Sequence, residues 1–378
     1  MNLVRSLSLL LVVGSAFLSA QNPAPGTSKD DEDVVKAGPK DPFTGGDPKA
    51  MAAAGIVAYG PFVWADDLRT EDVDKVLGER RILWIETAHF LIGCNLATSG
   101  VPEDAEARKM VNGELARLKK RHAKFPDRAS KLEPWVRLHL YAQRAEELYA
   151  EFATLVGHDA ATGTHLGQAR KFPILLFQKK SDLARYLDRF CNNKSEASQR
   201  HYYGKTSQRG FVLGAEADEV RDEPSVHAQF RHLLIETFTD AVGGVPYWLS
   251  LGLAHHYERQ VPSRMIMATI KDTESVDQES QHKWATKMRK RVQHPTLLIP
   301  FEELATKTDF GYWAHLQAWS RVDYLLTTDR AKFGTFLAGM KGGGYGVSRQ
   351  VEQLALVYDL EPAAFDAKWR DWVVKTYK

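Results

Sequence analysis

The chain has 378 residues, of which 44% are hydrophobic and 26% are charged. This is the composition of an ordinary globular protein, with apolar material for one large or two modest domains. The formal net charge of +2 gives no strong positive field, so we expect no nucleic-acid partner.

The first twenty residues are typical of a secretory signal peptide. Arg5 precedes an apolar run at residues 9–13, and the segment ends with the small residues Ser19 and Ala20. The run is too short for a permanent membrane span, and no Cys follows the expected cleavage point to carry a lipid anchor. We therefore expect residues 1–20 to be removed and the mature protein to be exported, either to the periplasm or outside the cell.

The rest of the chain is expected to contain a linker and two folded regions. Residues 21–55 are rich in Pro, Gly, Lys and Asp and are expected to be disordered. An α/β region should follow at 56–260, and a helical region at 261–378. Export would give Cys94 and Cys191 access to an oxidising compartment, where they could pair. Two buried thiols are an equally good interpretation, and the sequence leaves that choice open.

Local patterns predict most secondary-structure elements. The expected strands are Leu83–Ile92, Phe172–Phe177 and a hairpin over Ser198–Leu213. The expected helices before the central stretch are Glu103–Phe125, Glu133–Val156 and Ser181–Phe190. After an irregular segment at Val261–Pro300, the expected helices are Tyr312–Thr327, Lys332–Met340, Ser348–Tyr358 and Pro362–Lys378.

The central stretch, Ser225–Gln260, predicts two helices joined by a Gly-Gly-Val-Pro turn. Apolar residues recur at helical spacing between Phe230 and Ala241, and Pro246 can open the second helix. The expected helices are Ser225–Asp240 and Tyr247–Gln260.

The second of these helices contains the phrase WLSLGLAHHY at Trp248–Tyr257. It resembles the phrase WLxEGLAEYF of the gluzincin metallopeptidases, and within them of the secreted peptidase-MA-like proteins of bacteria. The resemblance implies an α+β, zincin-like fold with a mixed sheet, a central helix pair of the active-site type and a C-terminal helical subdomain. In such relatives the hairpin supplies an edge strand beside the cleft, where an extended peptide can lie.

In the relatives, the first helix carries HExxH and the Glu of the second phrase is the third zinc ligand. That ligand position is Leu251 here, and the eighteen-residue gap of many gluzincins leads back from it to His232. The first His then falls on Ala228 and the catalytic Glu on Gln229. Catalytic zinc of this class needs three protein ligands and a carboxylate base, which Ala, Leu and Gln cannot supply. The sequence therefore predicts no catalytic residues and no cofactor at this vestigial site.

The sequence allows two other arrangements of the site. A slipped motif would pair His227 with His232, but residues five apart on a helix point roughly 140° away from each other. A rebuilt metal site would use His232, Glu236 and His255, because the first two are four apart on one helix face. His255 is four residues after Leu251, where relatives carry an acid, and it would have room in the space left by Ala228.

Two functions of different class follow from these patterns. The first is a secreted, non-catalytic pseudo-metallopeptidase that binds a peptide or protein partner or is structural. The alternative is a zinc-dependent peptidase or other hydrolase with the rearranged site. The sequence does not name a partner or an oligomeric state.

Overall fold

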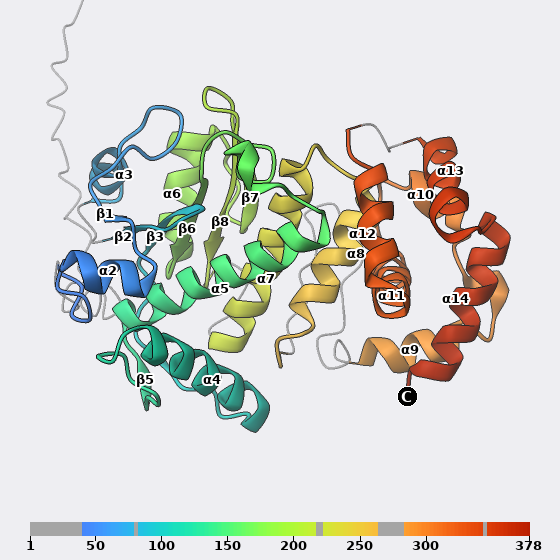
Figure 1. The fold of residues 1–378 in the computed structure, drawn as a ribbon, viewed down its shortest axis with the longest axis horizontal. Coiled ribbons are helices and arrows are strands. Elements are labelled where there is room, and N and C mark those ends of the chain that lie inside the picture. The colour runs from blue at the N-terminus through green and yellow to red at the C-terminus, as the bar shows by residue number, and fades with distance from the viewer. Residues whose placement is uncertain (1–39, 79–81, 217–221, 264–282, 343–345) are drawn as a thin grey trace, which may run out of the picture.

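The computed structural model of the chain describes residues 40–78, 82–216, 222–263, 283–342 and 346–378. It shows a mixed α/β protein with one large mixed sheet and many helices (Figure 1). The expected signal peptide and residues 21–39 of the expected linker lie outside the described residues, as do 264–282 of the expected irregular segment.

Six strands form the main sheet. They are, in spatial order, β1 (Ala58–Tyr59), β2 (Leu83–Glu86), β3 (Phe90–Cys94), β6 (Phe172–Phe177), β8 (Gln208–Gly214) and β7 (Gln199–Tyr203). The central pairs β3–β6 and β6–β8 are parallel, and the outer pairs are antiparallel. The predicted hairpin is confirmed as β7–β8, and β7 is the edge strand. A separate two-stranded ribbon joins β4 (Ser99–Gly100) to β5 (Lys131–Leu132).

Alternating side chains on the strands bury both faces of the sheet. One face packs on α5 (Pro134–Leu155) and α7 (Glu223–Ala241), with Phe90, Ile92, Ile174 and Phe211 in the shared core. The other face packs on α3 (Thr70–Val76) and α6 (Lys180–Cys191). The helix α4 (Ala105–Arg121) lies against α5 (Figure 1).

Two sequence predictions in the N-terminal half need correction. The expected single strand Leu83–Ile92 is a hairpin, β2 and β3, whose turn is held by Glu146 accepting hydrogen bonds from the Thr87 hydroxyl and the His89 amide. The expected linker ends earlier, because α2 (Pro48–Ala54) begins at a proline after an Asp47 cap.

The two cysteines do not form a bridge. Cys94 and Cys191 are both free, and they belong to the packing on opposite faces of the sheet. Burial raises the pKa of Cys94 to about 11 and that of Cys191 to about 12. Both are therefore thiols near neutral pH.

The C-terminal part is helical, as predicted. It contains α9 (Trp284–Arg291), α10 (Phe301–Thr306), α11 (Tyr312–Thr328), α12 (Arg330–Gly339), α13 (Val347–Tyr358) and α14 (Pro362–Thr376). The last four confirm the expected helices, whereas α9, within the segment expected to be irregular, and α10 were not predicted. The apolar residues of this part join the same continuous core as the sheet-facing helices.

The helix α8 (Tyr247–Glu258) connects the two parts. It follows α7 after a short turn and packs against both α7 and α11 (Figure 1). A Cβ at Gly252 would lie 2.6 Å from Cγ2 of Val322 and 2.7 Å from the carbonyl oxygen of Ala318, so this glycine allows α11 to approach closely.

No helix within the described ranges combines the length and the apolar character needed to cross a bilayer.

Candidate functional site

The helices α7 and α8 form an antiparallel pair whose register is fixed by side-chain contacts. Near the turn, the hydroxyls of Thr239 and Ser250 are 2.6 Å apart. At the far end, Nδ1 of His232 lies 2.6 Å from Oε2 of Glu258, and Nε of Arg231 donates to the Tyr257 carbonyl at 3.0 Å. Both predicted helices are thus confirmed, and they lie side by side.

This register does not bring all of the vestigial positions together. Continued along the pair, it places Ala228 opposite residue 261, ten positions from Leu251, or roughly 15 Å along the helix axis. Ala228, Gln229 and Leu251 are all buried, at 1%, 0% and 0% exposure. The residues of α7 nearest to the level of Leu251 are instead those around Glu236 and Phe238. The sequence spacing therefore misplaced the first two motif positions, because the gap length of relatives does not apply to this turn.

The pair instead encloses a polar cluster at the level of His232. Glu258 contacts two imidazoles, with Oε2 2.6 Å from Nδ1 of His232 and Oε1 2.8 Å from Nδ1 of His255. Beyond it, Nε2 of His255 lies 2.8 Å from Nδ1 of His315 on α11. On the other side, Nε2 of His232 is 3.6 Å from Oε2 of Glu236. A chain of five side chains thus runs from α7 through α8 to α11.

Burial and charge set the protonation of this cluster. Burial by itself would raise the pKa of Glu258, but the attraction of His255 and His232 lowers it to about 2. Burial also favours neutral imidazoles, and it lowers the pKa of His255 to about 4. At His232 the adjacent Glu258 carboxylate outweighs burial and raises the pKa above its ordinary value.

These protonation states give the hydrogen bonds a direction. An ionised carboxylate only accepts, so Nδ1–H of both His232 and His255 donates to Glu258. Neutral His255 then has a lone pair on Nε2, which accepts from Nδ1–H of His315. Glu258 therefore fixes the tautomer of the imidazoles on either side of it.

The donor atoms of His232, His255 and Glu258 lie within 4.8 Å of one another, which makes them a candidate metal set. Zinc bonds of about 2.0–2.3 Å in a tetrahedron place ligand atoms roughly 3.3–3.7 Å apart. The two contacts of Glu258, at 2.6 and 2.8 Å, are too short for ligands of one ion. As arranged, these residues fit a hydrogen-bonded cluster and do not fit a zinc site.

The rearranged set expected from sequence is only partly assembled. His232 and Glu236 are close, at a separation that two ligands of one zinc ion would have, but buried Leu251 supplies no third donor at their level. His255 turns toward Glu258 on its own helix and His315 on α11.

Sequence reasoning missed Glu258 and His315. Glu258 follows His255 by three residues and so shares its helix face, which is a local signal that the sequence contained. His315 is 60 residues away from its partner, and no local pattern connects the two.

His227 faces away from this cluster, as its spacing from His232 predicts. Its Nδ1 lies 4.0 Å from Oε1 of Glu114 on α4, whereas His232 contacts Glu258 on α8. The slipped motif is therefore wrong, because the two imidazoles lie on opposite sides of α7.

The edge strand β7 is connected to the cluster by Arg200. Its Nε is 3.6 Å from Oε2 of Glu236, and its Nη1 donates to the Glu236 carbonyl oxygen at 3.4 Å. The polar end of the cluster thus lies beside the edge of the sheet.

Comparison with protein-family models gives no match, and comparison with curated proteins gives no match either. The geometry of the described residues is therefore the basis for the functional proposal.

Proposed function

We propose that this protein is an exported, non-catalytic protein of zincin-like architecture that binds an extended peptide segment of a partner along the edge strand β7. The main support is the cluster around Glu258. Both imidazoles that face it are held by hydrogen bonds. The place of a third ligand is occupied by the buried side chain of Leu251. A water-activating metal would need all of these groups to be rearranged.

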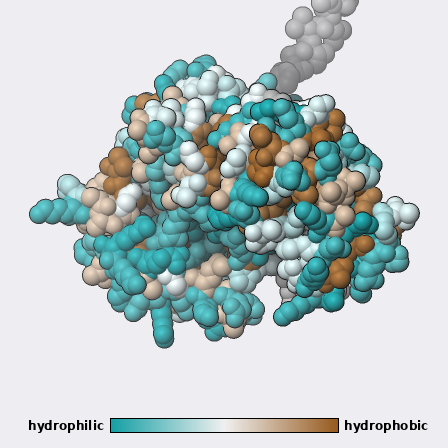
Figure 2. All heavy atoms as spheres, turned by 45° about the vertical axis from the view of Figure 1, so that its right-hand side comes forward, coloured by the Kyte–Doolittle hydropathy of each residue, from teal (hydrophilic) through white to brown (hydrophobic). Residues whose placement is uncertain are grey.

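The edge strand supports the binding part of the proposal. Among the described strands β7 pairs only with β8, so its other edge offers main-chain groups to a further strand. Tyr202, on β7, is 50% exposed and stacks under the guanidinium of Arg209. Figure 2 shows hydrophilic residues over most of the face it displays, with apolar residues in separate patches.

Metal content tests the non-catalytic part. Mature protein purified without chelator and dialysed against zinc should contain far less than one zinc ion per chain. It should also leave a fluorescent casein substrate uncleaved, with and without added zinc. One zinc ion per chain that is lost in His232→Ala would overturn the proposal and favour the hydrolase alternative.

Peptide selection tests the binding part. A library of random twelve-residue peptides displayed on phage should yield binders to the mature protein. Amide hydrogen exchange with a synthetic binder should then show new protection within Gln199–Tyr203. Protection confined to other elements would contradict the proposed surface.

Proline substitution supplies the control. In an antiparallel pair, neighbouring residues direct their N–H groups to opposite sides, so only one of Arg200 and His201 has an outward N–H. Of Arg200→Pro and His201→Pro, the variant that keeps its thermal stability should lose the selected peptides. Unchanged binding by that variant would show that β7 does not pair with them.

A further inference from the structure

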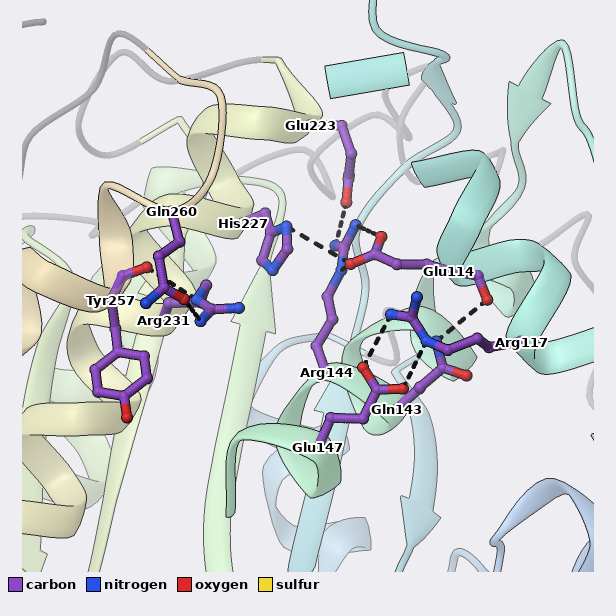
Figure 3. A network of polar contacts seen from close by, with 10 residues as sticks. All are labelled: Glu114, Arg117, Gln143, Arg144, Glu147, Glu223, His227, Arg231, Tyr257 and Gln260. Carbon is purple, nitrogen blue, oxygen red and sulfur yellow. Dashed lines mark hydrogen bonds and ion pairs between the residues drawn. The ribbon is translucent and has the colours of Figure 1, made fainter. Parts of the chain in front are cut away.

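A second polar site lies on the opposite side of α7 from the Glu258 cluster, and it is independent of the proposed peptide binding. A pocket of about 570 Å³ opens between α4, α5 and the first half of α7. Its walls include Arg117, Arg144, Glu147, His227, Arg231 and Gln260. Figure 3 shows these side chains converging from the three helices and the end of α8.

Most charges in this pocket already have partners. Arg144 donates to both oxygens of Glu114, at 3.1 and 2.7 Å, and to Oε1 of Glu223 at 2.6 Å. Arg117 and Glu147 form a two-contact ion pair at the rim, at 2.9 and 3.0 Å. Neither guanidinium group therefore has a free bidentate edge with which to bind a ligand.

Arg231 is different. Its guanidinium donates to the Tyr257 carbonyl at 3.0 Å and to Oε1 of Gln260 at 2.6 Å, and both acceptors are uncharged. Across the described ranges, no carboxylate forms an ion pair with it, although Glu151 and Glu114 are near enough to oppose the lowering of its pKa by burial. Among the described residues, Arg231 thus brings to this half-buried site a positive charge without a directly bonded counter-ion.

A count of the charges around Arg231 also leaves this arginine without a carboxylate partner. The inner group contains three guanidinium groups, of Arg137, Arg144 and Arg231, but two carboxylates, of Glu114 and Glu223, which pair with the first two arginines. Glu151 also lines the pocket, but it pairs with Arg330, so the positive charge left over in this group lies at Arg231.

His227 supplies the second unused group. It is 2% exposed, and its Nε2 is buried and has no hydrogen-bond partner in the part of the chain that the structure describes. Nδ1 faces the Glu114 carboxylate at 4.0 Å, and the negative charge of that carboxylate favours the ring hydrogen on Nδ1. Burial and the positive charges of Arg144 and Arg231 hold the pKa of His227 well below its usual range, so the imidazole is neutral. Its Nε2 therefore has a lone pair that can accept a hydrogen bond.

Arg231 and His227 are four residues apart on α7, so their side chains emerge on one face of the helix. In Figure 3 the guanidinium of Arg231 and the second ring nitrogen of His227 border the same gap. A buried polar group without a partner costs free energy, and a suitable ligand would remove that cost. The ligand must offer an anionic oxygen to Arg231 and, next to it, a hydroxyl to His227.

We propose that this pocket binds a small oxyanion that carries a hydroxyl group, with hydrogen phosphate as its simplest form. An anionic oxygen accepts from Arg231, and the P–OH group donates to Nε2 of His227. The acidic side chains already paired with Arg117 and Arg144 set the size of the site and repel ligands of higher negative charge.

Sulfate provides a matched probe. It has nearly the size and geometry of hydrogen phosphate, but at neutral pH it has no proton to donate. Calorimetric titration of the mature protein at pH 7 should show binding of inorganic phosphate and roughly tenfold weaker binding of sulfate, because sulfate leaves the His227 lone pair unsatisfied and repels it. No phosphate binding at millimolar concentrations, or equal affinity for the two ions, would overturn the proposal.

Three variants assign the contacts. Arg231→Met should weaken phosphate binding by about tenfold or more. Replacing His227 with Phe should bring the affinities for phosphate and sulfate to within about twofold of each other. Arg117→Gln, at the rim, should leave phosphate binding within about twofold of wild type. An Arg117 variant that loses as much affinity as the Arg231 variant would exclude the assigned site.

Folding is controlled separately. Each variant should keep the far-ultraviolet circular dichroism of wild type, and Arg231→Lys serves if Arg231→Met unfolds. Lysine keeps the charge but loses the planar fork, so phosphate binding should weaken by roughly threefold or more. In wild type, nitrogen NMR should show that the signal of Nε2 of His227 moves on phosphate addition. Unchanged binding in Arg231→Lys together with an unmoved signal would also overturn the proposal.

Discussion

Replacing Glu258 tests the direction of hydrogen bonding in the buried cluster. In Glu258→Ala, two buried N–H donors, of His232 and His255, lose their acceptor. Each unsatisfied donor costs about 1–3 kcal/mol, so the free energy of unfolding should fall by about 2–6 kcal/mol. That is a large part of the roughly 5–15 kcal/mol that stabilises a typical domain.

Glu258→Gln separates hydrogen bonding from charge. The amide oxygen can accept from one imidazole, and the amide N–H can donate to the other after a change of tautomer. This variant should lose only about 1–2 kcal/mol at pH 7.5, because the hydrogen bonds survive without the carboxylate charge.

The difference between Glu258→Gln and wild type should depend on pH. In wild type the raised pKa of His232 contributes stability below about pH 6.5, and this contribution is lost as the pH rises through the folded-state pKa. The lowered pKa of His255 acts in the opposite sense, so its part of the stability is lost as the pH falls from about 6.5 toward 4. Without the carboxylate, burial should lower both pKa values, and stability should fall steeply below pH 6.5, by about 1.4 kcal/mol per unit of pKa change for each imidazole.

Urea unfolding of both proteins between pH 7.5 and 5.5, followed by circular dichroism, measures this effect. Glu147→Gln is the matched control, because Glu147 is 37% exposed and its pair with Arg117 lies at the surface. A difference between Glu258→Gln and wild type that stays constant over the whole range would refute the assigned protonation states.

Three further predictions follow from the helix packing. The double variant Glu236→His with Leu251→Glu, if folded, should bind one zinc ion per chain by elemental analysis. The double variant Ala228→His with Leu251→Glu, if folded, should not. The reverse result would support the eighteen-residue spacing of the relatives. Gly252→Ala should lower the free energy of unfolding by about 1–3 kcal/mol, since the new methyl group meets the main chain of α11; an unchanged urea midpoint would show that α11 yields. A chain ending at residue 263 should be recovered mainly in aggregates, and a soluble, cooperatively folded fragment would contradict the shared core.

Elements with local signals could be predicted from the sequence. The helices α11 to α14 have apolar spacing; α11, α12 and α13 end at Gly or Asp, and α14 begins at a proline, signals that act within a few residues. The turn between β2 and β3 has no such marker, because it is held by Glu146 from a distant helix. For this reason the hairpin was predicted as one strand.

The candidate site shows the same division. The presence of two helices follows from local pattern, but the register between the helices depends on packing across the turn. Contacts such as Thr239 with Ser250 decide that register, and no spacing rule contains them. The pocket at Arg231 was not predicted, because its walls come from α4, α5 and α7, which are far apart in sequence.

The position of α8 has a consequence for the protein as a unit. Its Trp248 donates a hydrogen bond to Gln350 of α13, its His255 pairs with His315 of α11, and its Glu258 holds His232 of α7. The boundary expected near residue 260 therefore separates two stretches of sequence but passes through one interior. A recombination event or a protease cut there would expose apolar core surface on each half. The C-terminal helices therefore cannot be inherited or exchanged as an independent module.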